Sequence, residues 1–475
     1  MKLSKISIPY RAVKSAGTIL AIGAFSSLES LSFAPGYALA MLGIFFAGSL
    51  GISCWFYLVW RNFSFEITED TFDIKSGVIR KQRREIPLHR IQNVDISRSI
   101  FQRILGIAKI NLETAGGKTS EASLKYVDRE RAKDIQRQVR ELKQEGKDIE
   151  EVDEEESPIF SLSQKELTVL SLTSLNWKAL STVFVGMGLL GAVGPAIDDA
   201  INLTFLSVAV ILGGIIVFGG LVASAASNLN KYYDFKLFRR GKSLEFERGL
   251  LNRSEGSIPF EKIQNLRIEE NPLQRFFGYA TLKVETAGYS GQDQQQQGPE
   301  VAVPLAEKRR VEELSNEIFQ HGSYDIQGVP ARSFRRYFGR YLSASTVLTG
   351  LYFGATQLTQ TVFNPYILVP LTIASGIGAC LKYVHRGFYE GKEFFYTRNG
   401  FWNRITSVTP YYRIQNLDLS RSVFQRRLKL SSLILDTAGI YAFARNPRAI
   451  DINQETAENL FERVFESFKS SSKRD

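Results

Sequence analysis

The sequence predicts a polytopic α-helical membrane protein with about six spans in three hairpins and three β-rich modules. Each module is expected to be a small curved sheet or barrel capped by a C-terminal helix. Three observations lead to this fold class. Three long windows contain no Lys or Arg, one segment recurs three times, and each recurrence follows one window.

The windows cover residues 15–60, 179–230 and 341–381 and hold none of the 59 Lys and Arg of the 475-residue chain. The average composition resembles that of a soluble protein, because 44% of the residues are hydrophobic and 23% are charged. The segregation of charge excludes a simple soluble globular protein and a disordered one. A span needs about 20 apolar residues, so each window fits two.

Turn-forming residues divide each window into two expected helices. The expected spans cover about residues 16–33, 37–60, 179–197, 203–224, 341–361 and 366–381. The first is the weakest, and a signal peptide is the alternative, because basic residues precede it and Ala38-Leu39-Ala40 resembles a cleavage site. The apolar run continues through that site, which favours a retained span.

Basic residues crowd the outer flanks of the windows, whereas the breaks inside them carry none. The positive-inside rule then places both termini and all polar segments in the cytoplasm of a multi-pass inner-membrane protein. The net charge of +10 accordingly indicates an anionic membrane surface and not nucleic acid. Within the third window, Gly350 and Gly354 have the GxxxG spacing of closely packed helices.

A 30-residue segment aligns with itself three times without a gap, at residues 87–116, 259–288 and 410–439. Nine positions are identical in all three copies: a Pro, an Ile-Gln-Asn, a Gln-Arg and a Thr-Ala-Gly. The Ile and the Thr are 23 residues apart in every copy. This is the pattern of a triplicated module.

Each module reads as several short strands followed by one helix. Residues 63–68, 71–75 and 78–80 of the first copy are rich in β-formers, and residues 94–96 and 110–112 alternate in polarity. Apolar residues at helical spacing then predict a closing helix in each copy. They are Ala132, Ile135, Val139 and Leu142; Val311, Leu314 and Ile318; and Ala457, Leu460, Phe461, Val464, Phe465 and Phe468.

These elements give eight segments. The membrane hairpins are expected at residues 1–60, 166–230 and 340–385, and the modules at residues 61–146, 231–321 and 386–470. An acidic linker at 147–165 and a basic linker at 322–339 connect them. The Gln-rich stretch at 291–300 is expected to be a flexible loop.

An Ile-Gln-Asn, Gln-Arg, Thr-Ala-Gly module directly after a two-helix hairpin resembles the bacterial pleckstrin-homology-like membrane-flanked domain family. Three copies in one chain look like the YdbT-type membrane proteins. The resemblance covers nearly the whole chain and implies a pleckstrin-homology-like fold and a membrane location. It implies no catalytic residue. The second copy departs most, with Arg267, Glu269-Glu270 and Pro272, and the third has Lys429 in place of a Gly.

Three repeated polar positions are the candidate site. The Gln-Asn pairs either satisfy backbone groups at a strand end or bulge, or contact a ligand. The repeated Arg either binds a phosphate or carboxylate, or pairs with Glu113, Glu285 or Asp436 of its own copy. The candidates are Gln92, Asn93 and Arg103; Gln264, Asn265 and Arg275; and Gln415, Asn416 and Arg426.

Groups of basic residues flank the windows and are expected at the membrane surface, where each can gain about 1 kcal/mol from an anionic leaflet. They are Arg80, Lys81, Arg83 and Arg84; Lys236, Arg239 and Arg240; and Arg335, Arg336 and Arg340. The alternative is that they only anchor the topology.

The expected function is a non-catalytic one, in which three cytoplasmic modules bind protein, anionic lipid or both. Two Cys and three His offer no metal site or catalytic triad, so no cofactor and no enzyme activity is expected. The expected partners are membrane lipids and a protein partner or a second copy of the chain. The alternative is an export or lipid-handling component whose helices act and whose modules regulate.

Overall fold

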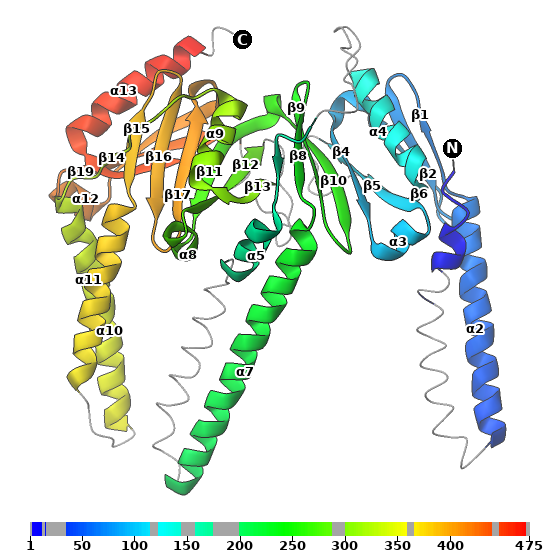
Figure 1. The fold of residues 1–475 in the computed structure, drawn as a ribbon, viewed down its shortest axis with the longest axis horizontal. Coiled ribbons are helices and arrows are strands. Elements are labelled where there is room, and N and C mark those ends of the chain that lie inside the picture. The colour runs from blue at the N-terminus through cyan, green and yellow to red at the C-terminus, as the bar shows by residue number, and fades with distance from the viewer. Residues whose placement is uncertain are drawn as a thin grey trace. The chain divides into compact units, whose positions relative to one another are not determined.

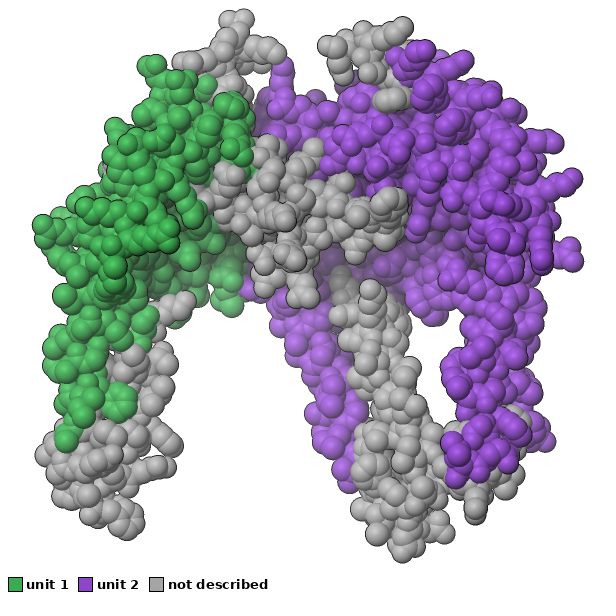
Figure 2. Space-filling view, turned by 180° about the vertical axis from the view of Figure 1, so that it is seen from behind, with its two compact units in different colours: residues 1–157, 245–257 green, residues 158–244, 258–475 purple. Residues whose placement is uncertain are grey.

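A computed structural model gives the fold (Figure 1). It describes residues 2–11, 15, 35–114, 122–143, 157–173, 199–286, 300–358, 365–438 and 446–471. The chain divides into two compact units (Figure 2): unit 1 comprises Met1–Ser157 and Glu245–Ser257, and unit 2 comprises Pro158–Leu244 and Ile258–Asp475. A short hairpin segment of the second module therefore belongs to the same unit as the first module.

The prediction of six membrane spans is wrong. Among the described residues, two helical segments are long and apolar enough to cross a membrane, Gly43–Arg61 and Ile211–Tyr232. The first is part of helix α2 (Pro35–Arg61) and the second is part of α7 (Asp199–Tyr232). The expected spans at 16–33 and 179–197 lie outside the described residues.

The third window forms two helices that do not qualify, α10 (Arg332–Leu358) and α11 (Leu368–Val384). The first turns of α10 carry four arginines, and hydroxyl-bearing residues and glycines interrupt the rest of that helix. The other helix is apolar, but it is only 17 residues long. The absence of Lys and Arg was thus a weaker signal than the density of apolar side chains, because Ser, Thr and Gly are uncharged without being strongly hydrophobic.

Gly350 and Gly354 do not mark a close helix contact. A Cβ atom added at either position would meet nothing within 4 Å among the described residues. Helices α10 and α11 are joined instead by a hydrogen bond of 2.7 Å between the hydroxyls of Ser345 and Ser375. Polar side chains therefore contribute to the contact of this helix pair, and the two glycines do not.

Unit 1 contains two sheets, with strand orders β1-β2-β3 and β6-β5-β4-β10. Its strands are β1 (Ser64–Ile67), β2 (Thr71–Ser76), β3 (Gln82–Pro87), β4 (Ile91–Arg98), β5 (Ile107–Thr114), β6 (Ala122–Asp128) and β10 (Arg253–Pro259). The short helix α3 (Ile100–Ile104) and the closing helix α4 (Arg129–Lys143) complete the first module. The predicted strand at 78–80 is wrong, because these residues form a bend that connects β2 to β3.

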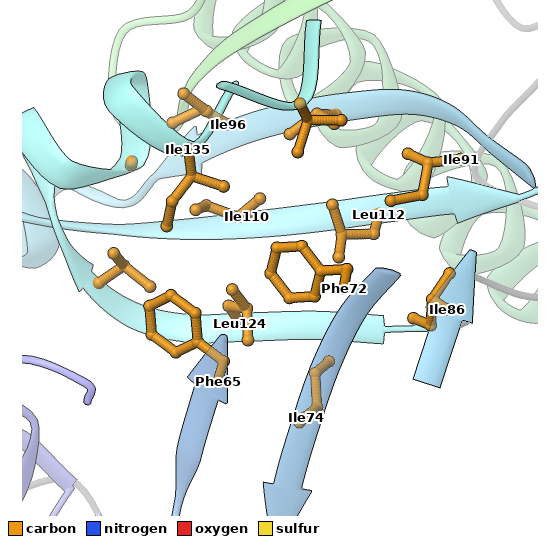
Figure 3. Packing of buried hydrophobic residues seen from close by; sticks show 14 of the residues in the cluster. Phe65, Phe72, Ile74, Ile86, Ile91, Ile96, Ile110, Leu112, Leu124 and Ile135 are labelled. Atoms are coloured by element: carbon orange, nitrogen blue, oxygen red, sulfur yellow. The ribbon is translucent and has the colours of Figure 1, made fainter. Parts of the chain in front are cut away.

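The core of the first module lies between its two sheets and α4. Figure 3 shows Phe65 and Phe72 from one sheet facing Ile110 and Leu112 from the other, with Ile135 of α4 beside them. All five side chains are buried. The alternating apolar residues of the strands and the helical spacing in α4 thus converge on one core, which confirms the predicted closing helix.

Unit 2 contains a sheet with strand order β13-β12-β11-β17-β16-β15-β14 and a second sheet with order β18-β19-β20. These strands are β11 (Ile263–Glu270), β12 (Tyr279–Thr286), β13 (Glu300–Glu307), β14 (Gln327–Gly328), β15 (Gly387–Glu390), β16 (Phe394–Gly400), β17 (Arg404–Pro410), β18 (Ile414–Ser420), β19 (Leu430–Thr437) and β20 (Arg448–Asn453). The strands β7 (Phe160–Ser161) and β8 (Lys236–Arg240) pair with each other, and β9 (Ser243–Arg248) crosses the unit boundary.

Short helices and closing helices recur at equivalent places in unit 2. The short helices are α8 (Pro272–Phe276) and α12 (Val423–Arg427), and the closing helices are α9 (Lys308–Phe319) and α13 (Gln454–Ser471). Helix α5 (Gln164–Thr173) lies between β7 and α7, outside the repeat. The closing helices α9 and α13 bury the apolar residues that predicted them, including Val311, Leu314, Ala457, Leu460 and Val464. Each copy of the repeat therefore ends in a helix packed on its own module.

The hairpin turns that precede β3, β10 and β17 each contain a Gly with positive φ, namely Gly77, Gly249 and Gly400. At Gly249 (φ +112°), an added Cβ would lie 2.0 Å from the carbonyl oxygen of Asn252. We expect Gly249→Ala to destabilise this hairpin by at least about 1–3 kcal/mol, because the strained φ and the backbone clash add. Hydrogen exchange of β9 and β10 measures the effect. Gly241→Ala is the control, since it shares a positive φ but meets no atom within 4 Å.

Candidate functional site

The strand that carries the Ile-Gln-Asn motif lies at the junction between consecutive modules. The motif strand β4 of the first module pairs with β10 of the second, and the motif strand β11 of the second pairs with β17 of the third. Both pairs are antiparallel and have the same register, since Arg253 lies opposite Arg98 and Arg404 lies opposite Glu270. We call the β4–β10 pair the first seam and the β11–β17 pair the second seam.

The Gln of each motif sits at a β-bulge. The pairing register shifts between Ile91 and Asn93, and it shifts at the equivalent point in the other two copies. In the second copy the Gln264 amide donates to the carbonyl of Lys262 (3.3 Å). This placement agrees with the structural alternative for the motif, in which the amide satisfies backbone at a bulge.

The Asn of the second motif contacts the next module directly. Asn265 is fully buried; its Nδ2 donates to Glu285 (3.2 Å), and its Oδ1 accepts from the Thr409 hydroxyl of β17 (3.3 Å). Asn265 thus binds Glu285, whereas one of the two alternatives from the sequence paired Glu285 with Arg275. The motif Asn therefore helps to seal the seam from water.

The repeated Arg reaches the hairpin of the following module. Arg103 Nη1 donates to the carbonyl of Leu250 (2.7 Å), and Arg275 Nη1 donates to the carbonyl of Trp402 (2.9 Å). Leu250 and Trp402 occupy adjacent positions of the equivalent hairpin turn. Charge-assisted hydrogen bonds of this kind fix position, so Arg103 and Arg275 hold the hairpin of the next module.

The Gln of the Gln-Arg pair has a separate local task. Gln102, Gln274 and Gln425 each close a capping box at the start of the short helix, with Ser99, Asn271 and Ser422 as the N-caps. A capping box satisfies two backbone donors that the helix would otherwise leave unpaired. The cap thereby stabilises the start of the short helix. That helix positions the Arg that follows the Gln.

The ion pairs of the two seams have opposite polarity. In the first seam, Arg98 of the motif strand binds Glu255 of the incoming strand (2.7 Å). In the second seam, Glu270 of the motif strand binds Arg404 of the incoming strand through two hydrogen bonds of 2.7 Å. Arg98 and Glu270 occupy the same place in the repeat. Each motif strand is therefore matched to one incoming strand by charge.

Positive charge surrounds the carboxylate of Glu270. The hydrogen bonds with Glu270 raise the pKa of Arg404. Burial and the charge of Arg404 lower the pKa of Arg275 and of Arg398, and burial followed by the charge of Arg275 lowers the pKa of His385. One carboxylate thus offsets three neighbouring guanidinium groups, and removing it leaves them facing one another.

At the first seam, side chains of β9 and β4 leave no room for a Cβ atom at Gly256. A Cβ added at Gly256 of β10 would lie 2.5 Å from the Phe246 ring and 3.0 Å from Asp95 Oδ1. We expect Gly256→Ala to destabilise the seam by about 1–3 kcal/mol, because the ring must move out of a packed position. Hydrogen exchange of β4 measures this opening. Unchanged exchange would contradict the tight seam, and Gly328→Ala, with no atom within 4 Å, is the control.

The third motif strand, β18, has the same motif but lacks an incoming strand among the described residues. It pairs with β19 on one side and forms the edge of its sheet on the other. Gln415 and Asn416 are exposed, whereas Gln264 and Asn265 are 4% and 0% exposed. Arg426 is exposed as well. The motif is thus buried by the strand that the next module supplies, and not by residues of its own copy.

The predicted membrane-surface basic residues have diverse settings. Arg80, Lys81, Arg83 and Arg84 are exposed on the β2–β3 turn and on β3, where Arg83 binds Asp73 (3.1 Å) and Glu85 (2.7 Å). Lys236 lies 3.3 Å from Asp234, Arg239 donates to the carbonyl of Glu317 (3.1 Å), and Arg240 lies over the Phe238 ring. Arg335 and Arg340 are exposed on the first turns of α10. Arg336 differs from the rest, because it binds Asp451.

Sequence reasoning missed a buried cluster around Asp451 of β20. Asp451 is fully buried and accepts from Tyr337 (2.5 Å), Arg386 (2.5 Å), Gln425 (2.7 Å) and Arg336. Burial raises the pKa of Tyr337. The cluster joins the start of α10, the chain just after α11, the short helix α12 and the last strand, so it fixes the third module on its helix pair. A buried carboxylate with two guanidinium groups is stable only when every partner is present.

The short helices carry exposed apolar side chains. Within each unit they lie on the side of the sheets from which the long helices extend (Figure 1). Phe276 is 82% exposed, and the exposed set comprises Phe101, Ile104, Phe276, Phe277, Val423 and Phe424. The hairpin turns that accept hydrogen bonds from Arg103 and Arg275 carry three more exposed apolar side chains, Leu250, Leu251 and Trp402. We call this set the apolar rim. Exposed apolar groups beside Arg suit a membrane interface.

Comparison with known proteins matches this architecture. The family model described as Bacterial PH domain matches residues 12–143, 185–321 and 345–467. The chain belongs to the bacterial PH domain family. The three bacterial PH domain matches coincide with the three copies of the repeat, which confirms the resemblance read from the sequence.

A curated relative supports a membrane location for this bacterial PH domain protein. The chain is 26% identical over 431 residues to the UPF0699 transmembrane protein YdbT of Bacillus subtilis (strain 168), covering 84% of this chain and 83% of that protein. Together with the two apolar helices, this similarity places the chain at a membrane. Among the described residues, no group of three or more His, Cys, Asp or Glu could hold a metal ion.

Proposed function

We propose that the protein is a non-catalytic, membrane-attached scaffold that presents three bacterial PH domains to a protein partner and to anionic lipid. The observation that carries the proposal is the use of the repeated motif. Arg103 of the first copy and Asn265 and Arg275 of the second contact the hairpin or strand of the next module. In the third copy Gln415 and Asn416 are exposed on the edge strand β18, and Arg426 is exposed on α12. A motif used for assembly at two places supports binding at the third.

The orientation we propose places the modules and the termini on the cytoplasmic face of the inner membrane. Helix α2 ends at Arg61 and α7 carries Lys231 in its last turn, which is the end from which each module continues. The N-terminal residues also lie at that end, because Leu3 is buried in the core of the first module and its carbonyl accepts from Trp60 Nε1 (2.9 Å). The positive-inside rule supports this orientation.

Contact with anionic lipid is proposed for the apolar rim. Its Phe and Trp side chains suit the headgroup region, and the nearby Arg103, Arg275 and Arg426 supply positive charge. Nucleic acid is not a proposed partner, because several of the basic side chains already bind carboxylates, carbonyls or aromatic rings of the chain itself. Three modules on one chain would also raise the effective concentration for a partner with several binding segments.

The test is purification of the full-length tagged protein from native membranes in mild detergent, with mass spectrometry of proteins and lipids. We expect a stoichiometric protein partner together with enriched anionic lipid. Phe424→Ser with Val423→Ser should reduce the lipid and leave the protein partner, while Phe465→Ser, also exposed but on the closing helix α13, is the control. A single enriched lipid with no protein partner contradicts the scaffold and favours a lipid-handling role.

A further inference from the structure

We propose that the outer edge of β18 is a docking site for a β-hairpin of a partner protein, whose strand next to β18 carries a carboxylate that binds Arg421. This inference deepens the proposed function, because it names the site and the chemistry of the partner segment. It rests on the two seams, which show what the same edge binds when an incoming strand is present.

The edge of β18 reproduces the polar residues of the β4 edge. Asp418, Ser420 and Arg421 occupy the places of Asp95, Ser97 and Arg98. The β11 edge differs, with Arg267, Glu269 and Glu270 at these places. The partner of β18 should therefore resemble β10, the strand that pairs with β4, and not β17, which pairs with β11.

Strand β10 meets the β4 edge with a carboxylate. Glu255 lies opposite Ile96 and binds Arg98 two positions along the strand. The equivalent Arg421 already binds Glu458 of α13, and its side chain is 27% exposed. A guanidinium group has five N–H donors, so Arg421 can hold a second carboxylate without releasing Glu458. The expected occupant carries its acidic residue opposite Leu419, as Glu255 lies opposite Ile96.

The apolar side chains of β18 also lack the cover that the seams provide. Leu417 and Leu419 are only partly buried, whereas Leu266 and Ile268 of β11 are fully buried beneath the second seam. An added strand would remove both from water and pair the backbone groups along the edge. Burial and backbone hydrogen bonds would supply affinity, while Arg421 would select the partner.

A second copy of this chain fits the edge less well. The strand equivalent to β10 in the first module is β3, and Lys81 and Arg83 occupy the places of Arg253 and Glu255. In the register of the seams, Lys81 would lie opposite Arg421 and Arg83 would lie next to it. Like charges at such positions are destabilising. Charge therefore favours a partner hairpin of different sequence over head-to-tail self-association.

The chain itself provides the probe, a fluorescently labelled peptide of residues 243–259, which form the β9–β10 hairpin. The receptor is the full-length protein in detergent, where β4 already holds its own β10. Since an isolated hairpin is only marginally stable, we expect weak but saturable binding by fluorescence anisotropy. Arg421→Glu should weaken binding about tenfold or more, and a peptide with Glu255→Arg should restore binding to that variant.

Recovery of binding by the reversed peptide shows that the Arg421→Glu variant is folded. Arg427→Glu is the matched control, because it makes the same charge change at an exposed position of α12 and should bind the original peptide normally. Equal binding by wild type and Arg421→Glu, or no binding by wild type, overturns the proposal. An Arg421-dependent dimer of the full-length chain that excludes the peptide makes a second copy the occupant, which also overturns it.

Failure of this test is distinguishable from failure of the proposed function. The peptide experiment contains no native partner and no native lipid, so it reports on the β18 edge alone. If the chain binds the peptide but retains no partner from native membranes, the docking site is supported and the scaffold function is contradicted. If the Arg421→Glu variant retains a partner as well as wild type does, the scaffold function is supported and the docking site is contradicted.

Discussion

Replacing Asp451 by Asn is expected to lower the free energy of unfolding of the third module by about 3–5 kcal/mol. The substitution retains the shape of the side chain and suits the backbone, because Asn tolerates the positive φ of 62° found at Asp451. It removes the charge that Arg336 and Arg386 both bind. Two buried or partly buried guanidinium groups would then lose their counterion, which is the costly way to break a buried ion pair.

Thermal unfolding of the full-length protein in detergent, with hydrogen exchange of β20 and the first turns of α10, measures this loss. We expect both segments to exchange faster, because the cluster joins them. Glu462→Gln makes the same chemical change at an exposed position of α13 and should stay within about 0.5 kcal/mol of wild type. If Asp451→Asn matches this control, the cluster does not hold the module on its helices.

Replacing Glu270 by Gln is expected to destabilise the second seam by about 3–5 kcal/mol, while the double variant with Arg404→Met should lose less than the sum of the two single changes. The single change leaves Arg404 without its counterion, beside Arg275 and Arg398, whose pKa values are already lowered by burial. The double change removes one of the three guanidinium groups. Such non-additivity is typical of partners in one buried network.

Hydrogen exchange of β11 and β17 reports the opening of this seam, and Trp402 fluorescence follows the hairpin that Arg275 holds. Glu313→Gln is the control, since Glu313 pairs with Arg309 and Arg310 on the surface of α9. Exposed pairs of this type contribute about 0–1 kcal/mol. Additive effects of Glu270→Gln and Arg404→Met would contradict the coupling.

Much of each module could be predicted from the sequence alone. The triplication, the closing helices and most strands followed from apolar periodicity, because each module buries its own core. The number of membrane spans could not be predicted in this way. The third window is uncharged, yet α10 is rich in hydroxyl side chains and starts with arginines, and the first halves of the other two windows lie outside the described residues.

The roles of the repeated residues could not be predicted in this way. Aligning the copies compares each module with its equivalents, whereas Arg103 and Arg275 contact the hairpin of the following module. One signal was present in the sequence. The second copy has Glu270 where the first has Arg98, and the third copy supplies Arg404 to match it. Asp451 and Arg336 are separated by 115 residues and lie outside the aligned segment, so the repeat gave no indication that they meet.

The two strands of the first seam are also synthesised far apart in time. Strand β4 ends at Arg98, and its partner β10 begins at Arg253, so the ribosome adds about 150 residues between the two. At about 5–20 residues per second, the edge of β4 stays open for roughly 8–30 seconds. During that interval nascent chains on one polysome present identical unpaired edges to one another. The like-charged Lys81 and Arg83 of β3 then discourage neighbouring nascent chains from joining through β4, before the chain delivers its own β10.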